Sequence, residues 1–274
     1  RIVERELYFR DIHGEYLLPE VRTIYLDDER SLPVQLIDAL KHGPSDTKGL
    51  YPVLPGEVQV LDAQIEGDAV SLYMPRSFID TRSTANQPEL SNLSIRVASL
   101  VLTITALSDV ASVKFYYQDE AGNYTDNPVN GIRFDKEMKA ADFTERIGRR
   151  IVVYFAGKQS AGLVPEYRAV ESDNREVENA VMEELMAGSL EGNVSVIRPR
   201  LKELGITATL SSSSPTVTVD LPAGFDGSTL SNTQQRMLIY AIVNSLTDPL
   251  NIPSVSEVRF TVGGQTVNNF GTVD

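Results

Sequence analysis

The chain contains no cysteine, and that absence excludes several kinds of chemistry. Disulfide bonds, thiolate metal sites and cysteine nucleophiles all depend on that side chain. Histidine is scarce as well, because His13 and His42 are the only two in 274 residues. The motifs HExxH, GxSxG, GxGxxG and GxxxxGK[ST] are missing, and no His, Asp and Glu share the spacing of metal ligands. The sequence therefore predicts no catalytic, cofactor-binding or metal-binding residues, and we expect a protein that is not an enzyme.

Long apolar runs are also missing. The longest, VASLVLTITAL at residues 97–107, is interrupted by Ser and Thr and is shorter than the roughly 18 residues that a membrane-spanning helix needs. We therefore expect no segment that crosses a membrane. The first residues, RIVERELYF, have neither a basic and apolar leader nor a cleavage site, so they begin a cytosolic protein or the cut end of a larger precursor.

Positive charge is too sparse and dispersed for a nucleic-acid surface. The chain has 25 Lys and Arg against 38 Asp and Glu, a net charge of −13. Acidic residues outnumber basic residues in both halves of the chain. Because non-specific binding to nucleic acid depends on clustered Lys and Arg that displace phosphate counterions, we expect no nucleic-acid partner.

Two short motifs occur twice at the same spacing. LYF at residues 7–9 returns as VYF at 153–155, and LPEVR at 18–22 returns as VPEYR at 164–168. Three further landmarks follow in the same order in each copy: a helical segment that ends at Gly, a strand followed by Pro and Phe, and Leu-Ser/Thr-Asp followed by Val-Lys/Arg-Phe. Their common order indicates a tandem duplication.

Each copy has the pattern of a ββαββαβ domain. The sequence predicts an α+β fold in which helices pack on a mixed or antiparallel sheet. We place the first domain at residues 1–118, a connector at 119–150 and the second domain at 151–274. The connector begins with the Gly-, Asn- and Pro-rich EAGNYTDNPVNG, and its later part has enough Phe, Ile and Met to dock on a domain.

Capping residues predict where the helices begin and end. Ser31 is a candidate N-cap of the first helix, which Gly43 ends. The corresponding candidates in the second copy are Asn174 for its first helix and Ser231 or Asn232 for its second. Apolar residues at helical or alternating spacing predict the buried faces: Leu36, Ile37, Leu40, Leu93, Val97, Leu100, Val101, Ile104, Val177, Val181, Leu185, Val217, Val219, Leu221, Leu238, Ala241 and Ile242, joined by Ser245.

The repeated Pro-Glu-x-Arg is the best candidate for special chemistry. Side chains two residues apart in a strand point to the same face, so Glu20 is expected beside Arg22 and Glu166 beside Arg168. We interpret each pair as an ion pair that orients the turn into the second strand. A carboxylate held by arginine stays ionised, which makes it a poor general acid. The alternative is a carboxylate-dependent hydrolase or sugar-binding enzyme that uses Glu20 and Glu166.

The remaining polar candidates are expected to be structural or exposed to solvent. His13 lies beside Gly14 in an expected loop, and His42 lies in the last turn of the first helix, where an imidazolium complements the helix dipole. The second copy has no histidine at either place. The acidic run at residues 27–29 lacks the DxDxDG spacing of a calcium loop, so we expect a solvated turn.

The repeated motifs resemble those of the GerM family. The resemblance is carried by LYF, LxPExR, a helix that ends in Gly, YPVLP, an alternating VxVDL strand and an LTD helix end, and it covers residues 6–118 and 151–263. Each copy resembles one GerMN domain. The second copy departs from the family at VSVIRPRLKELG, which lacks the YPVLP run of the first copy.

The resemblance implies a function in sporulation and germination. GerM-like proteins are sporulation lipoproteins of endospore-forming bacteria, associated with the channel complex that joins mother cell and forespore. Their domain is similar to the ring-building motifs of secretion and sporulation channels. We therefore expect a non-enzymatic envelope scaffold with protein partners of the channel complex and no cofactor, located outside the cytoplasm through a lipid anchor on a cysteine upstream of Arg1. We expect the soluble fragment to be monomeric. The alternative from another class is a peptidoglycan-binding or small-ligand-binding module.

Overall fold

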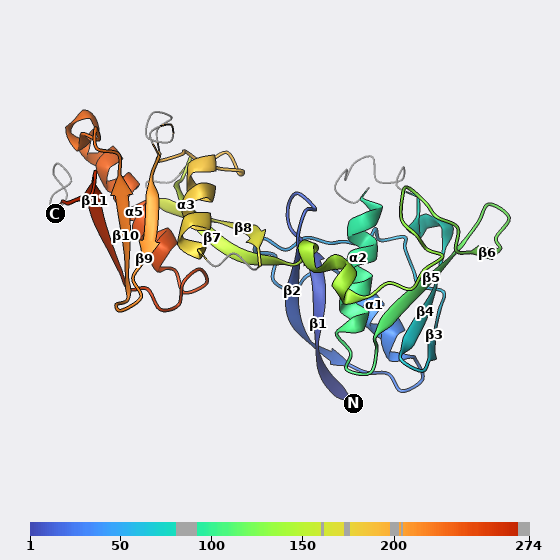
Figure 1. The fold of residues 1–274 in the computed structure, drawn as a ribbon. Helices are drawn as coiled ribbons and strands as arrows, with labels where there is room; N and C mark the ends of the chain where they lie inside the picture. Colours follow the sequence, from blue (N-terminus) through green and yellow to red (C-terminus); the bar gives the residue numbers. More distant parts are fainter. Residues whose placement is uncertain (81–91, 160–161, 173–175, 198–202, 204, 268–274) are drawn as a thin grey trace. The chain divides into compact units, whose positions relative to one another are not determined.

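The computed structural model describes residues 1–80, 92–159, 162–172, 176–197, 203 and 205–267 (Figure 1). Contacts between residues divide the chain into two units, Arg1–Arg149 and Arg150–Asp274. Both units have the predicted order of strands and helices, with one short strand added at the end of each. The α+β class and the ββαββαβ order are therefore confirmed.

The first unit contains a hairpin, two α-helices and a separate sheet. In chain order its elements are β1 (Ile2–Arg10), β2 (Leu17–Tyr25), α1 (Leu32–Lys41), β3 (Asp62–Glu66), β4 (Ala69–Met74), η1 (Arg76–Phe78), α2 (Leu93–Thr105), β5 (Ser112–Gln118), β6 (Tyr124–Thr125) and η4 (Ala140–Arg146).

The hairpin and the sheet of this unit are separate ladders. β1 forms a ladder with β2, whereas the other strands form a sheet in the order β3-β4-β5-β6. β4 and β5 are parallel, so the chain between them must cross over, and α2 makes that connection. α2 packs on β1 as well as on β5, so this helix joins the hairpin to the sheet (Figure 1).

The second unit repeats this arrangement. Its elements are β7 (Gly148–Ala156), β8 (Leu163–Glu171), α3 (Val177–Ala187), β9 (Thr207–Leu210), β10 (Thr216–Leu221), η5 (Gly227–Thr229), α5 (Asn232–Thr247), β11 (Glu257–Val262) and β12 (Gln265–Thr266). β7 and β8 form the hairpin, and the sheet has the order β12-β11-β10-β9 with β10 and β11 parallel.

The predicted apolar faces form the two cores. Every residue in the predicted set, including Ser245, is buried. One strand is shorter than its sequence pattern indicates, because apolar residues alternate in VQVLDAQI from Val58 onward. The regular strand begins only at Asp62, although Val58 and Val60 are buried. Pairing with β4 begins where the Leu61 N–H donates to the Tyr73 carbonyl, and the regular ladder starts at the next residue, Asp62.

The middle tyrosine of LYF and VYF explains part of the repeat. The backbone N–H of Tyr8 donates to Thr103 Oγ1 of α2 at 3.1 Å, and that of Tyr154 donates to Ser245 Oγ of α5 at 3.0 Å. Away from its hairpin partner, each strand is bridged near its end, β1 by Arg10 with Tyr51 and β7 by Ala156 with Val194. The tyrosine donors on that edge still need a partner. A hydroxyl on the crossover helix supplies it in both units.

The two predicted serine caps differ in what their side chains do. Ser231 caps α5, where its side chain accepts from the Gln234 N–H and the Gln234 side chain accepts from the Ser231 N–H. Ser31 occupies the N-cap position of α1, but its side chain makes no capping bond. The candidate cap Asn174 lies outside the described residues. Gly43 follows α1 with a φ of +82°, a conformation that favours glycine.

Residues 119–149 pack as part of the first unit. Phe134 is fully buried, and its ring contacts those of Phe78, Phe115 and Tyr117 at centroid distances of 6.4, 5.9 and 5.5 Å. Met138 exchanges two backbone hydrogen bonds with Val113 of β5, both at 2.8 Å. This stretch therefore completes the first core. Among the described residues, no helix is long and apolar enough to cross a membrane.

Candidate functional site

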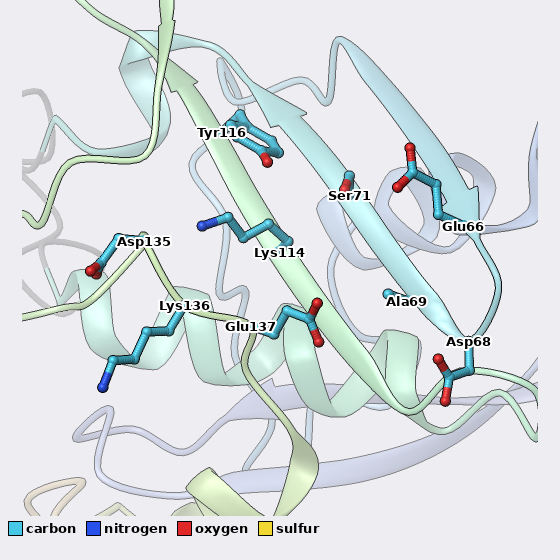
Figure 2. Close-up of a pocket in the computed structure, with 9 residues that line it drawn as sticks. All are labelled: Glu66, Asp68, Ala69, Ser71, Lys114, Tyr116, Asp135, Lys136 and Glu137. Atoms are coloured by element: carbon cyan, nitrogen blue, oxygen red, sulfur yellow. The ribbon is translucent and has the colours of Figure 1, made fainter.

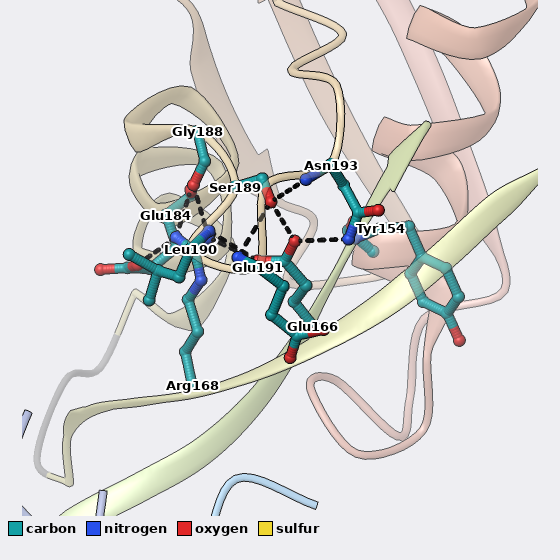
Figure 3. A network of polar contacts seen from close by, with 10 residues as sticks. Tyr154, Glu166, Arg168, Glu184, Gly188, Ser189, Leu190, Glu191 and Asn193 are labelled. Atoms are coloured by element: carbon teal, nitrogen blue, oxygen red, sulfur yellow. Dashed lines mark hydrogen bonds and ion pairs between the residues drawn. The ribbon is translucent and has the colours of Figure 1, made fainter. Parts of the chain in front are cut away.

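The Pro-Glu-x-Arg motif of the second unit forms a buried polar network (Figure 3). Glu166 and Arg168 lie on β8, two residues apart, and their side chains point to one face of the hairpin. They are 1% and 4% exposed, and Arg168 Nη2 lies 3.1 Å from Glu166 Oε2. The predicted ion pair is therefore present, and it is buried.

Arg168 binds the C-terminal end of α3. Its guanidinium donates to the carbonyl of Glu184 at 2.9 Å, to the Glu184 carboxylate at 2.8 Å and to the carbonyl of Gly188. The last carbonyls of a helix have no partner within the helix and carry partial negative charge, so a cation there is favourable. The guanidinium also lies over the Phe155 ring, 5.1 Å from its centroid.

Glu166 binds the loop that follows α3. It accepts hydrogen bonds from the Ser189 hydroxyl, from the Leu190 N–H at 2.9 Å and from the Asn193 side chain at 2.9 Å. Burial raises the pKa of the Glu166 carboxyl, but the bonds from Ser189, Asn193, Leu190 and Arg168 outweigh it, so the pKa is lowered below its ordinary value. The carboxylate is therefore held in its ionised form.

The first unit contains the same network with fewer partners. Arg22 donates to the carbonyl of Ala39 at 3.0 Å, to that of Gly43 at 2.8 Å and to the Glu20 carboxylate. Glu20 in turn accepts from two backbone N–H groups of the loop after α1, at 2.9 and 2.8 Å. Arg22 lies over the Phe9 ring, 5.3 Å from its centroid.

We call this arrangement of Glu, Arg, helix end and loop the helix clamp. The prediction that each Glu and Arg pair on one face is confirmed. The expectation that the pair orients the turn into the second strand stays a prediction. The pair ties the second strand of the hairpin to the end of the first helix and to the loop beyond it. Sequence spacing identified the pair but not the carbonyls, because those lie 16 to 21 residues away and belong to the backbone.

A separate groove of about 630 Å³ lies on the outer face of β4 and β5 in the first unit (Figure 2). Its lining is mostly charged and comprises Glu66, Asp68, Ala69, Ser71, Lys114, Tyr116, Asp135, Lys136 and Glu137. Lys114 Nζ is held at 2.8 Å by both Asp126 and the Phe134 carbonyl. These residues belong to none of the recurring motifs, although their alternation with buried apolar residues along β4 and β5 marks them as facing solvent.

A family comparison accounts for the repeat. The profile of the Germane family, described as sporulation and spore germination, matches residues 6–121 and 152–268. The chain belongs to this family. Both matched ranges include a helix clamp, and their separation confirms the tandem arrangement predicted from the recurring motifs.

Solved structures resemble the chain at low sequence identity. The tandem GerMN domains of the sporulation protein GerM from Bacillus subtilis are 18% identical, with 97% of this chain and 92% of that chain covered and a TM-score of 0.38. The first GerMN domain of the same protein is 20% identical over 51% of this chain and 99% of that chain, with a TM-score of 0.36. A Clostridium perfringens protein described as a lipoprotein is 22% identical over 52% of this chain and 89% of that chain, with a TM-score of 0.33. Curated protein sequences gave no match.

The histidines and the acidic turn of this Germane protein are not among the bonding groups of the first unit's helix clamp, although His42 directly precedes Gly43. His13 and His42 are exposed, and His42 Nδ1 lies 2.6 Å from the Asp38 carbonyl of its own helix. In the acidic turn, the Asp27 carboxylate accepts from the Glu29 N–H at 2.9 Å, and Gln35 binds the Asp27 backbone on both sides. Among the residues that the structure describes, no three His, Cys, Asp or Glu are grouped so as to hold a metal ion.

The chemistry of the helix clamp is that of a structural anchor. A general acid needs a proton to give near neutral pH, and the pKa of Glu166 is shifted the other way. Its oxygens are already occupied by donors from Arg168, Ser189, Leu190 and Asn193, which leaves little capacity for a substrate. The arrangement favours the structural interpretation over the hydrolase alternative.

Proposed function

We propose that the chain is a non-enzymatic scaffold of the cell envelope that acts in sporulation or spore germination through two GerMN-like domains. The observation that carries this proposal is the match of the Germane family to both repeats. It is supported by the use of the recurring charged residues, since Glu20, Arg22, Glu166 and Arg168 all bind the protein's own helix ends and loops.

The proposed partners are proteins of the channel complex that joins mother cell and forespore. The proposed location is the space between the two membranes, with a lipid anchor on a cysteine upstream of Arg1. Both follow from the resemblance to the GerM family. The net charge of −13 agrees with a partner other than nucleic acid. Two domains of one type offer two sets of surfaces for assembly.

A pull-down from sporulating cells tests the scaffold function. The tagged protein, expressed with its natural leader, is recovered after mild crosslinking, and its partners are identified by mass spectrometry. We expect channel-complex proteins to be enriched over a control in which the tag is carried by an unrelated lipoprotein. Recovery of cytoplasmic proteins alone would contradict the proposal.

The groove of the first unit favours a ligand-binding module as the second candidate function. Sedimentation of the purified chain with peptidoglycan sacculi, and calorimetry with soluble glycan fragments, separate the two candidates. The scaffold function predicts no specific sedimentation and no heat of binding. Saturable binding that is lost when the groove is altered, together with an empty pull-down, would favour the binding module instead.

A further inference from the structure

Three tyrosines form a cluster on the outer face of the first unit's sheet. Tyr73 of β4 and Tyr116 of β5 are directly opposite in register, and their rings stack with centroids 5.1 Å apart and an angle of 16°. Tyr124 of β6 meets Tyr73 edge to face at 5.0 Å. Neighbouring side chains of β4, such as Leu72 and Met74, point into the core, so the tyrosines occupy the solvent side of the strands. We call this cluster the tyrosine platform.

Carboxylates lie along two sides of the tyrosine platform. Asp62 is directly opposite Tyr73 on β3, and Glu66 follows on the same face of that exposed strand. The groove beside the platform, which Tyr116 lines, adds Asp68 and further carboxylates (Figure 2). Burial raises the pKa of the Tyr73 hydroxyl, and Tyr116, Glu66 and Asp62 raise it further, so negative charge acts at the ring itself.

The two lysines in the groove do not cancel this charge. Lys114 is engaged by Asp126 and by the Phe134 carbonyl, both at 2.8 Å. Its Nζ also lies over the Tyr116 ring, 5.5 Å from the centroid, so Tyr73 is the stacked ring that remains for a partner's cation. Lys136 lines the groove between Asp135, which pairs with Arg133, and Glu137, which accepts from the Ser112 hydroxyl. The surface around the platform therefore presents more negative than positive charge.

The fold does not require these tyrosines. In the second unit, Asp220 and Thr261 are the corresponding cross-strand pair between β10 and β11, and they hydrogen-bond to each other instead of stacking. The same parallel pair of strands thus forms without aromatic residues. Stacked tyrosines on the solvent side of the first unit need another reason, and binding supplies one because tyrosine is enriched at the energetic centres of interfaces.

We propose that the tyrosine platform and its groove bind an extended segment of a partner protein that carries arginine or lysine. A cation is attracted to the face of an aromatic ring, and carboxylates beside the ring add charge complementarity. A neutral glycan could also stack on tyrosine, but it would gain nothing from the carboxylates. The inference rests on the proposed scaffold function, for which it names one docking surface and the chemistry of its partner.

Fluorescence anisotropy with the purified full chain tests the platform. The probes are a fluorescein-labelled arginine-rich peptide and the same peptide with glutamine in place of arginine. We expect only the arginine peptide to bind, with an affinity that weakens as salt is raised. Replacing Tyr73 and Tyr116 by Ala should weaken binding about fivefold, because the cation–π contact with Tyr73 and the ring that stacks against it are lost. Tyr240→Ala is the matched control, since this tyrosine is 51% exposed on α5 of the second unit, and it should leave binding unchanged.

A second variant tests the carboxylates without removing any ring of the tyrosine platform. Asp62→Asn with Glu66→Gln changes two exposed side chains of β3, and it should weaken binding and flatten its salt dependence. Equal binding of the two peptides, or binding that both variants leave intact, would overturn the inference. So would platform-dependent binding of glycan fragments in place of the arginine peptide. Failure of the peptide measurement would overturn the docking surface but would not change the result of the pull-down. A pull-down without envelope partners would contradict the proposed scaffold function but would not change the peptide measurement.

Discussion

Glu166 is the residue on which the second helix clamp depends. It is 1% exposed, and its oxygens accept from Arg168, Ser189, Leu190 and Asn193. An ionised group removed from water requires such partners, since an unpaired buried charge is costly. The clamp is therefore a place where one substitution disturbs a strand, a helix end and a loop together.

Glu166→Gln should lower the free energy of unfolding by about 2–4 kcal/mol. The new amide N–H₂ group meets hydrogen-bond donors where the carboxylate accepted, and the buried Arg168 charge loses one of its two carboxylate partners, with Glu184 remaining. Glu20→Gln should cost less, about 1–2 kcal/mol, since the side chain of Glu20 is 11% exposed and its clamp has fewer bonds. Glu183→Gln, on an exposed position of α3, is the control and should change stability by less than about 0.5 kcal/mol. Urea denaturation measures all three. Equal effects at Glu166 and Glu183 would show that the clamp contributes nothing.

The pH dependence of the same variant follows from the pKa of Glu166. The pKa of this carboxyl is lower in the folded chain than the value of about 4.3 expected when unfolded. The unfolded state therefore binds the proton first as pH falls, and the stabilisation is complete above the unfolded pKa and lost as pH drops through the folded one. The difference in unfolding free energy between wild type and Glu166→Gln should stay constant above about pH 5 and shrink below about pH 4. A difference that grows on acidification would contradict this assignment.

At the scale of the elements, the second helix of each repeat, α2 or α5, begins with a side-chain cap, whereas the first helix, α1 or α3, does not. Ser231 forms a capping box with Gln234 at the start of α5, whereas Ser31 occupies the N-cap of α1 without a side-chain bond. Ser231→Ala should therefore cost about 1 kcal/mol, and Ser31→Ala should cost clearly less. Thermal unfolding of the two variants compares the caps within one protein. A larger effect at Ser31 would show that the capping bond does not decide the stability of these ends.

Periodicity predicted the elements well because each helix and strand buries one face. Leu93, Val97 and Leu100 on α2, and Val217 with Val219 on β10, lie in the cores as their spacing indicated. The separation of hairpin and sheet into two ladders was not predictable in this way, because period-2 patterning identifies a strand but not its partner. The platform tyrosines were missed for a related reason. Aromatic residues are common in strands, and the sequence does not show that these three meet on the solvent side until the register of the strands is known.

The division of the molecule places residues 119–149 with the first unit. A fragment of residues 1–149 should therefore fold alone, as should one of residues 150–274. A fragment of residues 1–118 should be less stable by about 3–5 kcal/mol, because it lacks Phe134, whose ring packs against Phe78 and Phe115. Circular dichroism and urea denaturation of the three fragments measure this. A stable 1–118 fragment would show that the stretch is only a connector.

The charge of the whole molecule bears on its self-association. With a net charge of −13 spread over both repeats, two copies of the chain repel one another. Salt at about 0.1 M screens this repulsion between exposed charges that are more than about 10 Å apart. A ring built from this chain alone would therefore form poorly at low salt, whereas a basic partner or a shared membrane anchor would remove the obstacle. Sedimentation velocity of the soluble chain should show a monomer at low salt, with at most weak association at high salt. A tight oligomer that salt does not change would contradict this expectation, because its contacts would have to outweigh the repulsion without any partner.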